Sequence, residues 1–154
     1  MNDGNGDDDI LRLDSQLCFA VYSAAHAFTR LYKGLLDALG LTYPQYLVMM
    51  ILWEGDNLAV KELGEKLQLD SGTLTPLLKR LEAAGLIRRT RDPNDERLVR
   101  ISLTPVGTEL RTKATAVPPA VLAASGCSLD ELGDLKKALL DLRDHLNAAS
   151  GFRP

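Results

Sequence analysis

The chain has 154 residues, of which 45% are hydrophobic and 25% are charged, and its formal net charge is −3 at pH 7. This composition predicts one soluble domain with helical extensions, since no apolar run approaches the ~18 residues needed to cross a bilayer. Residues 1–10 are expected to be a disordered acidic lead-in without the features of a signal peptide, which favours a cytoplasmic location. Two separated cysteines and two isolated histidines give no metal-ligand spacing, so neither a metal nor a cofactor is predicted.

The charge is unevenly distributed along the chain. The four aspartates among residues 1–9 contribute −4, which leaves a small positive balance for the remainder. Between Lys79 and Arg100, seven basic residues stand against four acidic ones. A local basic patch of this kind is what contact with nucleic-acid phosphates requires, whatever the total charge.

The first predicted helix covers residues 11–39. Its apolar stripe recurs at close to 3.6 residues and consists of Leu17, Val21, Phe28, Leu31 and Leu35. Asp14 or Ser15 is expected to cap its start, and Gly40 is expected to end it. With either cap, Cys18 falls in or near the first turn of this helix.

A helix-turn-helix is predicted in the next segment. Residues 44–54 are almost wholly apolar after an initial proline, which indicates a buried helix. A short third helix is marked by Val60, Leu63 and Leu67. Residues 68–70 then connect tightly to a fourth helix, with Asp70 or Ser71 as its N-cap and Gly85 just beyond its end. Two short helices joined by such a turn are typical of the helix-turn-helix.

The outer face of the fourth helix is small and hydroxylated at its start and basic further on. The candidate DNA contacts here are Ser71, Thr73, Thr75, Lys79 and Arg80. In a recognition helix the first residues meet base edges, while later cations meet phosphates. A plain solvated helix face explains this segment equally well when it is taken alone. Pro76 forfeits one backbone hydrogen bond within the helix, and the sequence offers no reason for that cost.

A predicted β-hairpin after the fourth helix favours the DNA-binding interpretation. Residues 86–91 and 97–103 are expected to form strands joined by a turn at 92–96, and a hairpin in this position is a wing. Arg97 stands at the tip, where a narrow minor groove attracts arginine. Asp95 is better placed to hold Arg97 than to touch an anionic duplex. Arg91 at the end of the first strand is a further candidate DNA contact.

The last third of the chain is predicted to be helical. Thr104–Pro105 begins a helix that Pro118–Pro119 interrupts, and Ser128 or Asp130 starts a final helix to about residue 147. Its leucines recur at close to heptad spacing and are Leu129, Leu132, Leu135, Leu139, Leu142 and Leu146. Leucine-rich terminal helices with no further domain to cover them indicate a dimer interface, from which two DNA half-sites follow.

These patterns together predict a mainly α protein with a small β wing. The winged helix-turn-helix covers about residues 44–104, and dimerisation helices cover about 11–39 and 105–148, in a single unit spanning 11–154. The expected partners are double-stranded DNA and a second copy of the chain, with no membrane.

Two sets of motifs resemble a known family. Residues 69–82 (Leu-Asp-Ser-Gly-Thr-Leu-Thr-Pro-Leu-Leu-Lys-Arg-Leu-Glu), followed by Asp-Glu-Arg at 95–97, resemble the MarR family of winged-helix regulators. Residues 17–20 (Leu-Cys-Phe-Ala) and 41–46 (Leu-Thr-Tyr-Pro-Gln-Tyr) are similar to its organic-hydroperoxide-sensing, OhrR-type subgroup. The similarity runs from about residue 11 to residue 146.

This resemblance implies a homodimeric repressor that binds an inverted-repeat operator when reduced. It implies that organic hydroperoxides oxidise Cys18 to a sulfenic acid, and that Tyr32 and Tyr43 hydrogen-bond its thiolate. In the two-cysteine class of the subgroup, a second cysteine near the position of Cys127 then forms a disulfide between subunits. Oxidation thereby releases the operator. Without the resemblance, a small buried hydrophobe is the simpler interpretation of either cysteine.

Helical geometry bears on where the tyrosines act. Tyr22 is at i+4 from Cys18 and shares its face. Tyr32 is at i+14, on nearly the same face but roughly 21 Å further along a straight helix. Tyr32 is therefore expected to contact the Cys18 of the other subunit, across an antiparallel helix pair. The helix dipole and tyrosine hydroxyl donors would both favour the thiolate, which is the reactive form.

Two alternatives to a peroxide-sensing repressor remain open. The first is a MarR-type regulator that a small phenolic or lipophilic ligand releases, with Cys18 as a bystander. The second is an enzyme, a thiol peroxidase using Cys18. The thiol peroxidase hypothesis leaves the wing unexplained. The sequence also has neither a CxxC motif nor a βαβ pattern, so a non-enzymatic protein is predicted.

Overall fold

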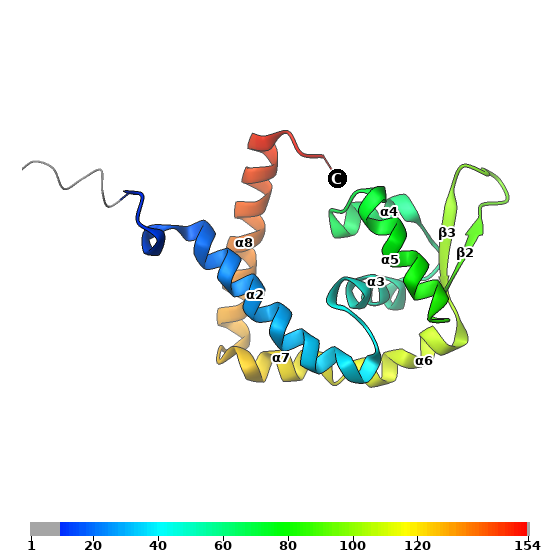
Figure 1. The fold of residues 1–154 in the computed structure, drawn as a ribbon, viewed down its shortest axis with the longest axis horizontal. Coiled ribbons are helices and arrows are strands. Elements are labelled where there is room, and N and C mark those ends of the chain that lie inside the picture. Colours follow the sequence, from blue (N-terminus) through cyan, green and yellow to red (C-terminus); the bar gives the residue numbers. More distant parts are fainter. Residues whose placement is uncertain (1–9, 154) are drawn as a thin grey trace, which may run out of the picture.

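The computed structural model describes residues 10–153 and has two visibly different parts (Figure 1). The elements in chain order are η1 (Leu13–Ser15), α2 (Leu17–Leu36), η2 (Asp37–Leu39), α3 (Tyr43–Glu54), β1 (Leu58–Ala59), α4 (Val60–Leu67), α5 (Ser71–Ala83), β2 (Ile87–Arg91), β3 (Val99–Leu103), α6 (Pro105–Ala114), α7 (Val117–Ser125) and α8 (Leu129–Ser150). Helices α3 to α5 and the β2–β3 hairpin lie on one side, and α2, α7 and α8 lie on the other. This confirms the predicted fold class, a mainly helical chain with a winged helix-turn-helix.

The first helix differs from its prediction at its start. Neither Asp14 nor Ser15 caps it; the N-cap is Gln16, without a side-chain capping bond. The carboxylate of Asp14 is occupied by the guanidinium of Arg12, at 3.0 and 2.7 Å, and Ser15 lies inside the short 3-10 turn η1. Cys18 is consequently the second residue of α2. The acidic lead-in predicted for 1–10 lies outside the described residues, apart from its last position.

Other helix termini follow local side-chain chemistry. The Asp70 carboxylate accepts the backbone N–H of Thr73 at 2.7 Å, and Thr104 caps α6 as predicted. Ser128 caps α8, which continues to Ser150, three residues beyond the prediction. The break between α6 and α7 precedes the proline pair, because prolines fit the first turn of α7, where no N–H bond is lost.

A three-stranded antiparallel sheet of order β1-β3-β2 forms the wing and its base. In the hairpin, Arg89 of β2 pairs with Ile101 of β3 and Arg91 pairs with Val99. The two-residue strand β1 was not predicted; its Leu58 pairs with the same Ile101. The side chain of Asp56 also accepts the N–H of Leu103 at 2.8 Å, which fastens β3 to the loop before β1.

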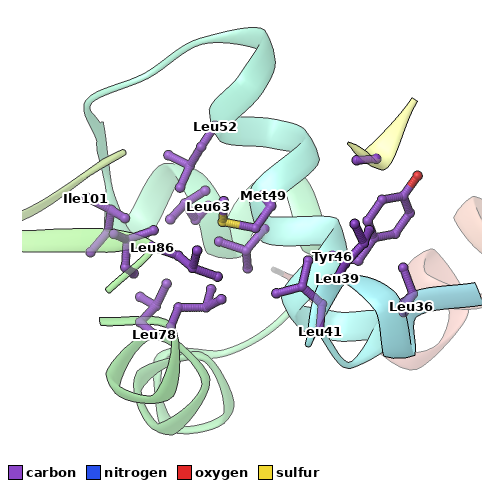
Figure 2. Close-up of a cluster of buried hydrophobic side chains, with 14 of the residues drawn as sticks. Leu36, Leu39, Leu41, Tyr46, Met49, Leu52, Leu63, Leu78, Leu86 and Ile101 are labelled. Carbon is purple, nitrogen blue, oxygen red and sulfur yellow. The ribbon is translucent and has the colours of Figure 1, made fainter. Parts of the chain in front are cut away.

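Leucines from several helices build the core, with Met49 at its centre (Figure 2). Its fully buried members are Leu36, Val48, Met49, Leu52, Leu63, Leu74, Leu78, Leu81, Ile87 and Ile101. Each such side chain stabilises the fold by about 1.5–3 kcal/mol relative to exposure. Gly107 allows α6 to approach this core closely, because a Cβ there would lie 2.0 Å from the carbonyl oxygen of Leu86.

The helices outside this core leave large apolar side chains exposed. On α2 and α8 they include Leu17, Phe19, Val21, Tyr22, Phe28, Leu129, Leu135, Leu139, Leu140 and Leu146. Within residues 10–153, no single helix is long and apolar enough to cross a membrane, and only α2 with η2 and α3, bent by 63°, meet that criterion as a pair. The same residues contain no group of three His, Cys, Asp or Glu side chains that could hold a metal ion.

Candidate DNA interface and thiol site

Helix α5 presents part of its predicted DNA-contacting face to solvent. Lys79 and Arg80 are exposed, as the interpretation requires. Near the start of the helix the hydroxyls are partly engaged: Thr73 donates to Asp70 at 3.2 Å, and the half-buried Thr75 donates to the Ser71 carbonyl at 2.7 Å. The cations are therefore immediately available for phosphates, while the hydroxyls also serve the helix itself. The predicted DNA contacts of this helix, Ser71 included, remain predictions.

An ion pair joins the recognition helix α5 to the wing. The Glu82 carboxylate accepts the Nε of Arg89 at 2.7 Å and the Arg89 backbone N–H at 3.1 Å. These contacts hold the pKa of Glu82 below its usual range, chiefly through the Arg89 side chain. Sequence reasoning missed this pair because no local spacing signals a contact across the helix-to-strand turn.

At the wing tip, Asp95 holds Arg97 by three hydrogen bonds. Its Oδ1 accepts the Nε and the backbone N–H of Arg97, both at 3.1 Å, and its Oδ2 accepts Nη2 at 3.4 Å. The Arg97 side chain is nevertheless 91% exposed. Arg91 is turned along the hairpin, where its Nη1 donates to the Glu96 carbonyl at 3.4 Å. The geometry thus matches the expectation that Asp95 supports Arg97, and gives Arg91 a contact within the wing.

Asp92, at the base of the wing turn, was also missed by sequence reasoning. It is 6% exposed and is the one buried charged residue within 10–153. Its carboxylate accepts the N–H groups of Asn94 and Asp95 and the Nε of Arg100. The Arg100 guanidinium, followed by the Asn94 N–H, holds the pKa of Asp92 below its usual range. Its sequence setting, an aspartate before proline, reads only as a turn.

Cys18 has an open setting in this chain. Its thiol is free and exposed at the second position of α2. Tyr22, one turn further on, is 63% exposed and packs edge-to-face on His26, with 4.4 Å between ring centroids. The sensor surface that the resemblance implies is therefore not enclosed by this chain alone.

Tyr32 and Tyr43 lie together, as their shared predicted role requires. Their ring centroids are 4.5 Å apart, and Tyr46 adds a third phenol at 6.0 Å from Tyr32. Burial raises the pKa of all three, and for Tyr32 the neighbouring phenols add to the effect of burial. These groups consequently stay protonated at neutral pH and can donate hydrogen bonds. Sequence reasoning placed Tyr46 in a buried helix and in the OhrR-type segment 41–46, but gave it no role of its own.

Cys127 lies in the connection between α7 and α8. Its thiol is free and half-buried, and its backbone N–H donates to the Ser125 hydroxyl at 3.2 Å. The preceding Gly126 adopts φ 67°, a left-handed conformation that suits glycine. Cys127 is thus held in a helix-ending turn, as its predicted loop setting implied.

Comparison with known proteins identifies the family. The MarR family model matches residues 41–99. The chain is 56% identical over 146 residues to the HTH-type transcriptional regulator TtmR of Methylorubrum extorquens (strain PA1), covering 95% of this chain and 75% of that protein. It is 50% identical over 139 residues to the organic hydroperoxide resistance transcriptional regulator of Bacillus subtilis (strain 168), covering 90% and 95% respectively. The chain belongs to the MarR family.

Solved MarR-like structures resemble the present fold closely. Reduced AbfR bound to DNA matches with a TM-score of 0.74 and 36% identity, covering 91% of this chain and 97% of that one. The disulfide-formed state of AbfR, a protein of Staphylococcus epidermidis, gives a TM-score of 0.62 with 34% identity, covering 95% and 97%. This MarR-family chain is a transcriptional regulator whose relatives place it with the OhrR-type group.

A groove between α2 and α7 adds a feature that the motifs of this MarR-family chain did not predict. It is predominantly apolar and is lined by Ala24, Ala27, Phe28, Leu31, Val121, Ala124 and Ser125. Ser125 also bonds to Cys127, so the groove ends beside the second cysteine. An apolar organic group fits the chemistry of this lining.

Proposed function

We propose that the chain is a homodimeric repressor that binds an inverted-repeat operator and releases it when an organic hydroperoxide oxidises Cys18. The observation that carries this proposal is the free, exposed Cys18 in the first turn of α2. It stands among exposed apolar side chains, including Phe19 and Val21, which one protomer leaves uncovered. The 50% identity to an organic hydroperoxide resistance regulator supports an organic hydroperoxide as the oxidant.

The redox step follows from thiol chemistry. The Cys18 thiolate attacks one peroxide oxygen, the O–O bond breaks, and the departing alkoxide takes a proton to become an alcohol. Cys18 is thereby oxidised to a sulfenic acid, and the peroxide is reduced. The thiol of Cys127 from the second subunit then attacks the sulfenic sulfur. Water leaves, and an intersubunit disulfide forms.

Helical distance supports placing the sensor between subunits. Cys18 and Tyr32 both lie on α2, and the helical rise puts them roughly 21 Å apart, beyond the reach of a phenol. In an antiparallel pair of α2 helices that sets each Cys18 against Tyr32 of the second subunit, the crossing falls near Ala25. Small residues at 24 and 25 would let the helices approach closely there. The protonated Tyr32 and Tyr43 hydroxyls then supply donors for the thiolate, with Tyr22 beside it.

In the proposed DNA-bound state, the winged helix-turn-helix of each subunit contacts the duplex. Each α5 would enter a major groove, with Lys79 and Arg80 near phosphates, and each Arg97 would enter an adjacent minor groove. The chain matches DNA-bound AbfR with a TM-score of 0.74 in both its reduced and its overoxidised form, and disulfide-formed AbfR with 0.62. This similarity supports the DNA-bound arrangement of the fold.

A second candidate function rests on the α2–α7 groove. Its apolar lining favours a small lipophilic or phenolic ligand that releases DNA without thiol chemistry. The two candidates make opposite predictions for the Cys18→Ser variant, which keeps the groove but lacks the thiol.

One experiment tests the proposal. Operator binding of the reduced protein is measured before and after stoichiometric cumene hydroperoxide, for wild type, Cys18→Ser and Cys127→Ser. Wild type is expected to lose affinity by at least tenfold, and Cys18→Ser is expected to stay bound. Cys127→Ser should lose the disulfide dimer on non-reducing gels. Release of Cys18→Ser by the peroxide would overturn the sensing role of the thiol.

A further inference from the structure

We propose that Asp92 is a positioning residue for DNA recognition, which fixes the wing turn from which Arg97 reaches the minor groove. The inference rests on the proposed operator binding and adds a residue that neither the motifs nor the wing-tip pair accounts for. Asp92 lies buried under the turn and so presents no surface to a ligand. A carboxylate in such a place is stable only with full hydrogen bonding.

One oxygen of the Asp92 carboxylate is hydrogen-bonded to the backbone of the turn itself. Oδ1 accepts the backbone N–H of Asn94 at 2.7 Å and that of Asp95 at 3.2 Å. Asp95 is the residue whose own carboxylate holds Arg97. A continuous set of contacts therefore runs from the buried carboxylate, through the backbone of Asp95, to the guanidinium at the tip.

The other oxygen of Asp92 ties this turn to the sheet. Oδ2 accepts the Nε of Arg100 in β3, and the Nη1 of Arg100 donates to the Asn57 carbonyl at 3.2 Å. The backbone N–H of Asp92 also donates to the Leu98 carbonyl at 2.9 Å, and this bond closes the turn of the hairpin. Arg100 therefore connects the wing turn to the loop before β1, within the same winged helix-turn-helix that carries α5.

The direction of the change in operator affinity distinguishes a positioning role of Asp92 from a purely electrostatic one. A carboxylate near an anionic duplex repels it, so removing the charge alone should tighten operator binding. Loss of the turn geometry should weaken binding, because Arg97 would no longer be held ready for the groove. The proposal therefore requires weaker binding from a substitution that makes the wing more positive.

The variants Asp92→Ala and Asp92→Asn test this, with Glu96→Gln as the matched control. All three remove one negative charge from the wing, but the exposed Glu96 side chain does not support the turn. With reduced protein and operator DNA, Asp92→Ala is expected to bind about tenfold more weakly, in the range of one lost base-reading contact. Asp92→Asn keeps one acceptor oxygen and should be intermediate. Glu96→Gln should bind equally well or more tightly.

A double-mutant cycle with Arg97→Ala distinguishes positioning from general damage. In the Arg97→Ala background, Asp92→Ala is expected to cost less than about twofold, because the residue through which it acts is already gone. An equal cost in both backgrounds, or unweakened binding by Asp92→Ala, would overturn the proposal. Thermal unfolding of each variant verifies the fold, and the smaller Asp92→Asn change serves if Asp92→Ala does not fold. If Arg97→Ala itself leaves operator affinity unchanged, that result contradicts the role of the wing in the proposed function and not the role of Asp92.

Discussion

The reading head, residues 36–117, and the flanking helices α2 and α8 use leucine in opposite ways. In the head, Leu63, Leu74 and Leu81 are fully buried. Along α8 no residue is buried, and along α2 only Leu36 is, at the end that enters the head. The head therefore contains its own core, whereas the flanking helices leave apolar side chains exposed. Leucine content alone does not separate these cases; the packing of the elements does.

The largest effect is expected from the core of the head. Leu74→Ala should lower the free energy of unfolding by about 2–5 kcal/mol, because a cavity forms beneath the recognition helix. Denaturant titration followed by the fluorescence of Trp53, the single tryptophan, measures it. The loss should not depend on protein concentration. Leu135→Ala on α8 is the control, and its loss should vanish on dilution. Equal losses at all concentrations would contradict the difference between the two regions.

A charge placed on α8 tests whether a second copy covers the flanking helices. Leu139→Lys should weaken self-association at least tenfold, since a lysine would be buried in an apolar interface. Sedimentation equilibrium gives the association constant. Val106→Lys, on an exposed site of α6 in the head, is the matched substitution and should leave association unchanged. A dimer that survives Leu139→Lys and dissociates with Val106→Lys would place the interface on the head.

Acid should destabilise the head through its bound carboxylates. The pKa values of Glu82 and Asp92 are lowered in the folded chain, first of all by Arg89 and Arg100 respectively. Their stabilising contribution is therefore present above the unfolded pKa values of roughly 4 and is lost as the pH falls through the lower folded values. Thermal midpoints measured from pH 7 to pH 3 should fall accordingly.

Glu82→Gln sharpens the acid prediction. It should melt below wild type at pH 7 and converge on wild type as the pH falls, because protonation removes the same interaction from the parent. A constant difference across the pH range would mean that the ion pair with Arg89 contributes nothing to the acid response.

Local signals explain which parts of the fold could be predicted from sequence. The recognition helix and its Asp70 cap, the Thr104 cap and the hairpin were predicted correctly, because each depends on residues a few positions apart. The start of α2 was predicted wrongly because Arg12 occupies Asp14. Strand β1 was missed because two residues carry no periodicity, and its pairing with Ile101 is set by the tertiary fold.

The candidate site divides in the same way. Asp95 beside Arg97 could be predicted because the two residues are neighbours in the turn. The contact of Asp92 with Arg100 spans the hairpin, and the sequence around neither residue predicts it. The closeness of Tyr32 and Tyr43 followed from the family resemblance rather than from spacing. If a second chain covers the flanking helices, as proposed, the only trace of that interface in one chain is its exposed apolar residues.

The smallest expected effect concerns the contact between the two regions. The Asn147 amide of α8 donates to the Gln68 side chain at 3.0 Å, and Gln68 lies in the turn before the recognition helix with φ 55°. Asn147→Ala should cost about 0.5–1.5 kcal/mol of stability, the usual net contribution of one hydrogen bond. A cycle with Gln68→Ala in thermal or denaturant unfolding measures the coupling. A coupling energy above about 0.5 kcal/mol means that displacement of α8 is felt at the turn that aims α5, whereas additive losses would make the flanking helix energetically independent of the head.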